Sequence, residues 1–118
     1  MIRIEAAVEP VPFKRVVGNR HKFNDKRYSE YKEALGYFAL QAMKGQPPLE
    51  GAIKLSVDFY KHKPKDVTSR NWGDVDNFLK AVMDALTGIC YLDDRQVVEA
   101  TGRKHFGEPK VIITLEAI

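Results

Sequence analysis

The sequence predicts a single α+β domain over residues 1–118, in which two helices pack on a mixed β-sheet. Apolar and polar residues alternate over residues 2–8 and 52–60, as they do in half-buried strands, and two C-terminal segments, the last of them rich in Val and Ile, also indicate strands. In two other segments apolar residues recur every three or four positions, as in helices that bury one face. The resulting order is β-α-β-α-β-β, and the length suits one domain with its own core.

The N-terminal half is expected to contain two strands and one helix. Residues 2–8 alternate and predict the first strand, and residues 13–27 are basic, contain Gly and Asn, and predict a loop. A helix over Lys26–Lys44 follows, and the alternation of residues 52–60 predicts the second strand. The apolar stripe of this helix comprises Tyr28, Tyr31, Leu35, Phe38 and Ala42.

The C-terminal half is expected to begin with a polar loop up to Gly73 and a helix over about Asp74–Leu86. Strands near Gln96–His105 and Lys110–Ala117 complete the sheet. The second strand, this helix and the third strand are consecutive, so they can form a right-handed parallel crossover. The stripe predicted to face the core comprises Val75, Phe78, Leu79, Val82 and Leu86.

Composition narrows the range of functions. No run approaches the roughly 20 apolar residues of a membrane helix, and the charged N-terminus does not suit a signal peptide, so a cytoplasmic protein without a membrane partner is expected. The single cysteine, Cys90, can form neither an internal disulfide nor a thiolate metal site and is expected to fill a small apolar space. A net charge of +3 and a pI near 9.0 weakly favour a polyanionic partner.

Two carboxylates stand at the predicted start of the second helix. The chain is extended just before that helix, so Asp74 and Asp76 can point to the same side, and Asp76 shares a helix face with Lys80. Capping of the helix N-terminus is the simpler explanation of such an Asp pair. A second acidic pair, Asp93-Asp94, can equally be a solvated turn.

If three of these carboxylates converge, phosphodiester hydrolysis becomes possible. Mg²⁺ prefers oxygen ligands and keeps several waters beside a few carboxylates. The metal would activate water and offset charge on the scissile phosphate, while a lysine would stabilise the developing charge. The spacing alone does not show that Asp94 lies near Asp74 and Asp76.

The sequence resembles the RusA family of Holliday junction resolvases, which is common in bacteria and their phages. The resemblance extends weakly to the N-terminal strand and the first helix and is strongest over about Asp74–Lys104. Three motifs carry it: Asp74-Val75-Asp76-Asn77-Phe78-Leu79-Lys80, then Asp84-Ala85-Leu86, then Asp93-Asp94-Arg95-Gln96-Val97-Val98-Glu99.

The resemblance implies a role for four residues. Asp74 and Asp76 match the metal-binding pair of the family, Asp94 matches its third catalytic carboxylate, and Lys80 matches its catalytic lysine. It also implies a homodimer that uses Mg²⁺, with Mn²⁺ as a substitute and no organic cofactor, to nick two strands of a four-way DNA junction symmetrically. A two-fold dimer would place two equivalent sites on a substrate of approximate two-fold symmetry.

Basic loops on both sides of the carboxylates are candidate phosphate contacts, although lysine and arginine are usually exposed without binding anything. Trp72, just before Asp74, could stack at a junction opening or fold back onto the core. We expect hydrolysis of branched DNA; the alternatives are an inactive junction-binding module, a nuclease for flaps or forks, and a plain structural domain. The candidate DNA-binding residues are Lys14, Arg15, Arg20, Lys22, Lys65 and Arg70.

Overall fold

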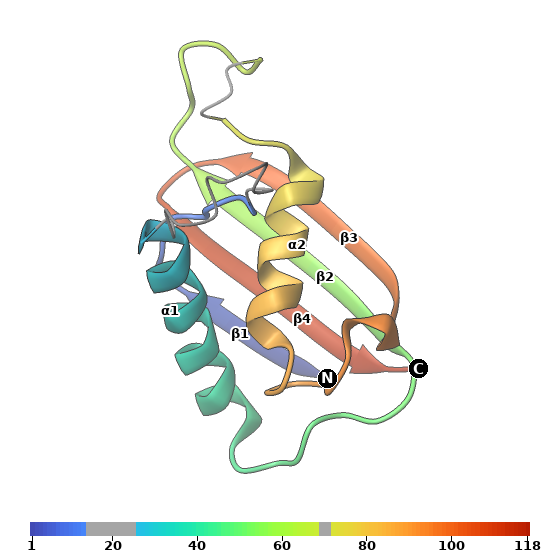
Figure 1. Cartoon of the computed structure of the whole chain (residues 1–118). Helices are drawn as coiled ribbons and strands as arrows, with labels where there is room; N and C mark the ends of the chain where they lie inside the picture. Colours follow the sequence, from blue (N-terminus) through green and yellow to red (C-terminus); the bar gives the residue numbers. More distant parts are fainter. Residues whose placement is uncertain (14–25, 69–71) are drawn as a thin grey trace, which may run out of the picture.

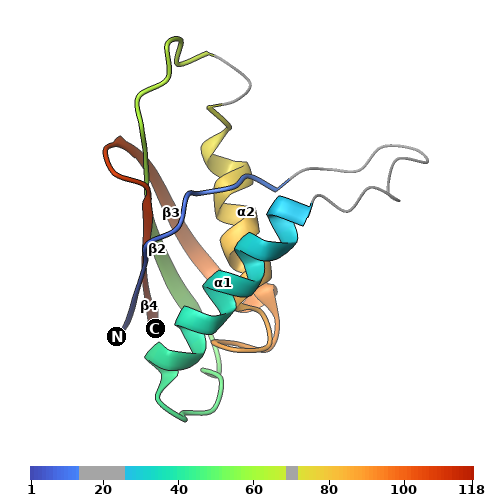
Figure 2. The same cartoon turned by 90° about the vertical axis from the view of Figure 1, so that its left-hand side faces the viewer.

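The computed structural model describes residues 1–13, 26–68 and 72–118, which form two layers. One layer is a four-stranded sheet in the order β1-β4-β2-β3, and both helices cover the same face of it (Figures 1 and 2). The predicted α+β class, element order and mixed sheet are therefore confirmed. The elements are β1 (Ile2–Ala6), α1 (Lys26–Met43), β2 (Ile53–Lys61), α2 (Val75–Leu86), β3 (Val97–Phe106) and β4 (Lys110–Ala117).

Differences from the predicted boundaries are small. β1 ends at Ala6, after which the chain leaves the sheet, and the Phe13 N–H donates to the Asn77 carbonyl at 2.9 Å. A short 3-10 helix, η2 (Asp94–Gln96), precedes β3 and was not predicted. Most of the predicted basic loop lies outside the described residues. Neither helix in the described part of the chain is long and apolar enough to cross a membrane.

The core lies between the helices and the central strands. Every second residue of β2 is apolar and points toward the helices, so this face of the strand is buried. The apolar residues of β4 alternate in the same way and are buried on the same face of the sheet. Phe78 of α2 contacts Phe59 of β2, with ring centroids 5.2 Å apart. Cys90 is also fully buried, which confirms its predicted packing role. The buried strand residues are Ile53, Leu55, Val57, Phe59, Val111, Ile113 and Leu115.

A parallel crossover joins the two strands on the β3 side of the sheet. β2 and β3 pair in parallel, as predicted, and α2 carries the chain back between them (Figure 1). α2 approaches β3 closely because Gly102 has no side chain there. A Cβ at Gly102 would lie 2.8 Å from Leu79 Cγ and 3.0 Å from Val75 Cγ2.

The prediction that Val75 faces the core is wrong. Its side chain lies over Gly102 but remains 36% exposed. The reason is that β3 is an edge strand, so no further element among residues 1–13, 26–68 and 72–118 covers this flank of α2. Leu79, one turn later, is only partly buried for the same reason.

Gly102→Val should lower the free energy of unfolding by about 1–3 kcal/mol, because the added atoms must displace Leu79 and Val75. Thr101→Val is the matched control, since it places the same side chain one residue away on the opposite face of β3. Urea unfolding of both variants measures the difference. Equal stabilities would contradict the close packing of α2 on β3.

Candidate active site

Asp74 and Asp76 lie together at the N-terminus of α2, and both are exposed. Asp74 is the N-cap residue, with φ −93° and ψ 142°, so the predicted extended backbone before the helix is confirmed. The Asp74 side chain makes no capping hydrogen bond, whereas Asp76 Oδ1 accepts from the Asn77 N–H at 2.9 Å. Capping therefore does not account for the carboxylate of Asp74.

The chain is held tightly where it enters α2. Gly73 has φ +81°, and a Cβ there would lie 2.8 Å from the Phe78 ring, so both backbone angle and space require glycine. Lys104 of β3 donates from Nζ to the Gly73 carbonyl at 2.6 Å. These contacts fix the backbone that presents Asp74.

Trp72 folds back against the protein. Its side chain is 7% exposed, and its ring lies 5.5 Å from that of Phe106, centroid to centroid. Lys104 Nζ lies 4.5 Å from the centroid of the indole. Of the two roles considered for Trp72, packing within the protein agrees with this position, because a buried ring has no free face for stacking on a base.

Lysines surround the carboxylate end of α2. Lys61 Nζ lies 5.5 Å from the Phe78 ring, Lys63 Nζ lies 5.7 Å from the Phe106 ring, and Lys80 Nζ lies 4.9 Å from the Phe13 ring. Burial lowers the pKa of Lys104; neighbouring Lys61 adds to this effect, while Asp74 opposes it. The cations beside Asp74 make this end of α2 attractive to phosphate.

Asp94 lies at the other end of α2. It opens η2 and lines a shallow depression together with Asp84 and Thr87 near the end of the helix. α2 has 12 residues, so at about 1.5 Å per residue its ends are about 18 Å apart. Within one chain, therefore, Asp94 is not brought to Asp74 and Asp76.

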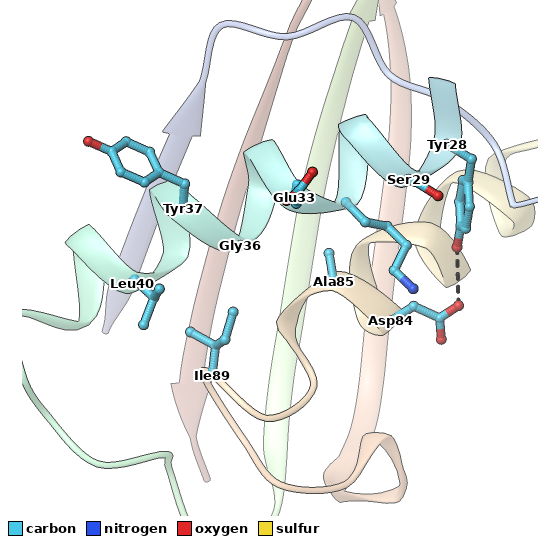
Figure 3. A pocket seen from close by; sticks show the side chains of 10 residues that line it. Tyr28, Ser29, Glu33, Gly36, Tyr37, Leu40, Asp84, Ala85 and Ile89 are labelled. Atoms are coloured by element: carbon cyan, nitrogen blue, oxygen red, sulfur yellow. Dashed lines mark hydrogen bonds between the residues drawn. The ribbon is translucent and has the colours of Figure 1, made fainter. Parts of the chain in front are cut away.

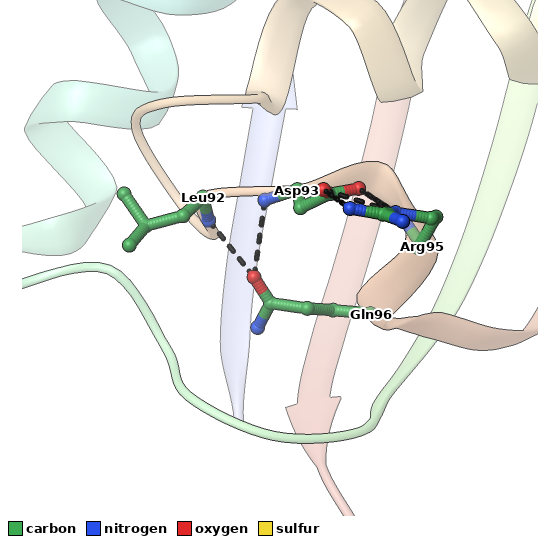
Figure 4. A network of polar contacts seen from close by, with 4 residues as sticks. All are labelled: Leu92, Asp93, Arg95 and Gln96. Atoms are coloured by element: carbon green, nitrogen blue, oxygen red, sulfur yellow. Dashed lines mark hydrogen bonds and ion pairs between the residues drawn. The ribbon is translucent and has the colours of Figure 1, made fainter.

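Asp93 and Asp94 have different surroundings. The Asp93 carboxylate accepts from the Arg95 N–H at 2.8 Å and pairs with the Arg95 guanidinium at 2.8 Å (Figure 4). The Arg95 hydrogen bonds lower the pKa of Asp93 to about 2. Asp93 also forms a capping box with Gln96. The Asp93 carboxylate is thus occupied by hydrogen bonds within the turn, which leaves Asp94 as the carboxylate available at the depression.

Gln96 holds the segment around Asp94 in place. Its Oε1 accepts from the N–H groups of Leu92 and Asp93 at 3.0 and 3.1 Å (Figure 4). Its Nε2 donates to the carbonyls of Leu49 and Gly51 at 2.9 and 3.1 Å. One side chain therefore fastens the start of β3 to the loop before β2.

A groove lies between α1 and α2, toward the C-terminal end of α2. Tyr28 of α1 donates from its hydroxyl to Asp84 Oδ2 at 3.1 Å across this groove (Figure 3). Burial, with the charge of Asp84, raises the pKa of Tyr28 well above its ordinary value. Asp84, which belongs to the second sequence motif, therefore joins the helices.

The donor atoms suit a hard divalent cation. Among the described residues, no three His, Cys, Asp or Glu side chains come together closely enough to hold a metal ion. Asp74 and Asp76 nevertheless provide two exposed carboxylates, and Mg²⁺ is commonly held by one or two carboxylates with water completing its shell. The pair fits such an ion, and a third carboxylate would have to come from elsewhere.

The predicted DNA contacts are only partly described. Lys65 lies exposed in the loop after β2. Sequence reasoning missed Lys104 as a site residue, although it contacts both Trp72 and Gly73. Lys104 lies on the same face of β3 as Ala100 and Gly102, the face that the helices cover. This position can be recognised only when the register of β3 against β2 is known. The other candidates, Lys14, Arg15, Arg20, Lys22 and Arg70, lie outside the described residues.

Comparisons with known proteins agree with the resemblance. The profile of the family described as endodeoxyribonuclease RusA matches residues 8–116. An uncharacterized protein of Bacillus subtilis (strain 168), YqaN, is 30% identical over 100 residues, covering 70% of this chain and 70% of that protein. The matched range includes both helices, all of β2, β3 and η2, and the carboxylates at both ends of α2. The chain belongs to the RusA endodeoxyribonuclease family.

Proposed function

We propose that this protein is a Mg²⁺-dependent crossover junction endodeoxyribonuclease that nicks four-way DNA junctions in recombination and repair. The observation that carries the proposal is the pair Asp74 and Asp76, which stand exposed at a helix start beside several lysines in a chain of the RusA family. Carboxylates surrounded by cations suit a site that must hold both a metal ion and a phosphate.

The carboxylates would bind the metal, and the lysines would contact phosphate. Asp74 and Asp76 would hold the metal, and Mn²⁺ would substitute for Mg²⁺. Because Asp94 lies at the other end of α2, it would serve as a further ligand only from the second copy of a homodimer. When bound, the metal would lower the pKa of a coordinated water and offset charge on the scissile phosphate. Lys80, one turn after Asp76, contributes a cation to the phosphate, and Lys61, Lys63 and Lys65 would contact neighbouring phosphates.

Two rival functions share this chemistry or this fold. An inactive module would bind junctions tightly without nicking them, and a nuclease of other preference would cut flaps or forks faster. The test is nicking of a synthetic four-way junction, a flap, a fork and a linear duplex, each with Mg²⁺, with Mn²⁺ and with EDTA. Metal-dependent cleavage that favours the four-way junction is expected; none by the folded protein on any of these substrates would refute the enzyme.

Asp74→Asn should abolish nicking and leave junction binding unchanged or stronger, because it removes a negative charge that faces phosphate. Glu30→Gln is the control, since it neutralises an exposed carboxylate on α1. Gel-shift and nicking assays on the same preparations separate binding from cleavage. If Asp74→Asn instead unfolds the protein, as circular dichroism would reveal, a structural role for this side chain is favoured.

Lys80→Ala should slow nicking by about 10²-fold, the usual cost of losing one electrostatic contact to a transition state. Its affinity for Mn²⁺, measured by calorimetry, should stay close to that of the unchanged protein, because the lysine is not a ligand. Lys44→Ala, at an exposed position just after α1, is the control. Normal turnover of Lys80→Ala would exclude the proposed role.

Lys104→Met should free the segment 72–74, because it removes the hydrogen bond to Gly73 and the cation over Trp72. Trp72 is the only tryptophan in the chain, so its fluorescence emission should shift to longer wavelength, and nicking should slow with it. Lys104→Arg keeps the charge and a donor and should preserve both properties to a large extent. Unchanged emission from Lys104→Met would contradict this positioning role.

A further inference from the structure

Lys80 of α2 lies against Phe13, which belongs to the segment that follows β1. The Lys80 Nζ atom is 4.9 Å from the centroid of the Phe13 ring, within the range of a cation–π contact. We infer that Phe13 is a positioning residue, whose ring holds the Lys80 ammonium ready for a phosphate and apart from the carboxylate of Asp76. This inference rests on the proposed function and adds a residue to its site.

The backbone of Phe13 is attached to the helix that carries Lys80. The Phe13 N–H donates to the Asn77 carbonyl at 2.9 Å, in the first turn of α2. Just before it, the ring of Pro12 restricts the backbone, and the side chain of Val11 is buried. The Phe13 ring is therefore held at a defined place beside the start of α2.

The Phe13 ring is also held from the side of α1. It meets the Tyr28 ring edge to face, with centroids 5.9 Å apart and an interplanar angle of 76°, an arrangement that aromatic pairs prefer. Tyr28 in turn donates to Asp84 Oδ2 at 3.1 Å. Because these contacts join Phe13 to both helices, its ring can fix the end of a long and otherwise flexible lysine.

Without Phe13, Lys80 would be expected to pair with Asp76. An acidic residue four positions before a lysine on a helix usually attracts it. In the part of the chain that the structure describes, the two side chains form no ion pair, and Asp76 Oδ1 accepts from the Asn77 N–H instead. An ammonium drawn over the Phe13 ring does not neutralise this carboxylate, and it keeps N–H donors for a phosphate oxygen.

The held ammonium lies on the side of α2 that the proposed chemistry needs. Side chains on a helix lean toward its N-terminus, and Phe13 is bonded to the first turn, so Lys80 is held toward the carboxylate end of α2. Lys80 remains exposed, so the ring covers one side of the ammonium and leaves another accessible. A group that is already in place for the reaction loses less entropy at the transition state.

Phe13→Leu tests the ring, because leucine is apolar and bulky but has no aromatic face. It should lower kcat for junction nicking about tenfold and leave KM nearly unchanged, since the charge of Lys80 is retained. Phe13→Tyr keeps the ring and should restore the rate. Tyr60→Leu is the matched control and should nick normally: it removes a ring that lies 4.8 Å from Lys110 Nζ, on the sheet face opposite the helices.

A double-mutant cycle separates positioning from packing. If Phe13 acts through Lys80, Phe13→Leu should slow nicking by no more than about twofold in a protein that already carries Lys80→Ala. A tenfold loss in that background as well would overturn the inference, and so would a loss that Phe13→Tyr does not restore. Should Phe13→Leu fail to fold, pentafluorophenylalanine at position 13 keeps the ring shape, reverses its charge distribution, and should also slow nicking.

A further measurement does not depend on cleavage. Protons that lie over an aromatic ring resonate upfield, so the Hε protons of Lys80, assigned by their loss in Lys80→Ala, should show upfield NMR shifts in the unchanged protein. The shifts should disappear in Phe13→Leu and persist in Phe13→Tyr. Lys80 shifts equal to those of an unstructured chain would refute the contact.

The outcomes separate the inference from the proposed function. A protein that shows the Lys80 shifts but nicks no DNA refutes the nuclease and still establishes that Phe13 holds the lysine. A metal-dependent nuclease whose Phe13→Leu variant keeps its full kcat refutes the positioning role and leaves the nuclease standing.

Discussion

The parallel pairing of β2 with β3 determines most of the remaining arrangement. Two parallel neighbours require the chain to return along the full length of the sheet before the second strand begins, and α2 makes that return. Residues at the start of α2 therefore stay near the ends of the strands, and residues after α2 stay near their beginnings. The separation of Asp74 from Asp94 follows from this connection and not from any local feature of the turn.

Close contact with β3 gives the crossover its rigidity. Gly102 allows α2 to rest almost on the strand backbone, and Lys104 joins the end of that strand to Gly73. At the other end, Gln96 holds the start of β3 to the loop before β2. Both carboxylate positions are thus attached to the same strand, so each is fixed by backbone contacts and not by the packing of its own side chain.

The fold could be predicted from the sequence because its signals are periodic. The alternation in β2 and β4 and the spacing of Leu35 in α1 and Phe78 in α2 directly reflect burial. The position of Val75 could not be predicted, since its exposure depends on β3 being an edge strand, and strand order is not a periodic property. The contacts of Lys104 could not be predicted either, because they depend on the pairing register and join residues 31 positions apart.

For the candidate site, sequence and structure contribute different parts. Spacing predicted that Asp74 and Asp76 share one end of a helix, and their extended and first-turn backbone positions agree. Spacing could not separate Asp93 from Asp94; the family resemblance did. The structure adds a physical reason, because a carboxylate already bonded to Arg95 has fewer oxygen lone pairs left for a metal.

The β1 edge of the sheet resists the addition of another strand. In the part of the chain that the structure describes, β1 pairs with β4 alone and has five residues. Pro10 and Pro12 follow it, after the chain has left the sheet. Proline cannot donate to a ladder, so a short edge followed by prolines offers little to an added strand. The open face carries ion pairs such as Lys54–Glu99 at 3.3 Å, which disfavours stacking of sheets. This edge and this face are therefore both poor starting points for the growth of a fibre.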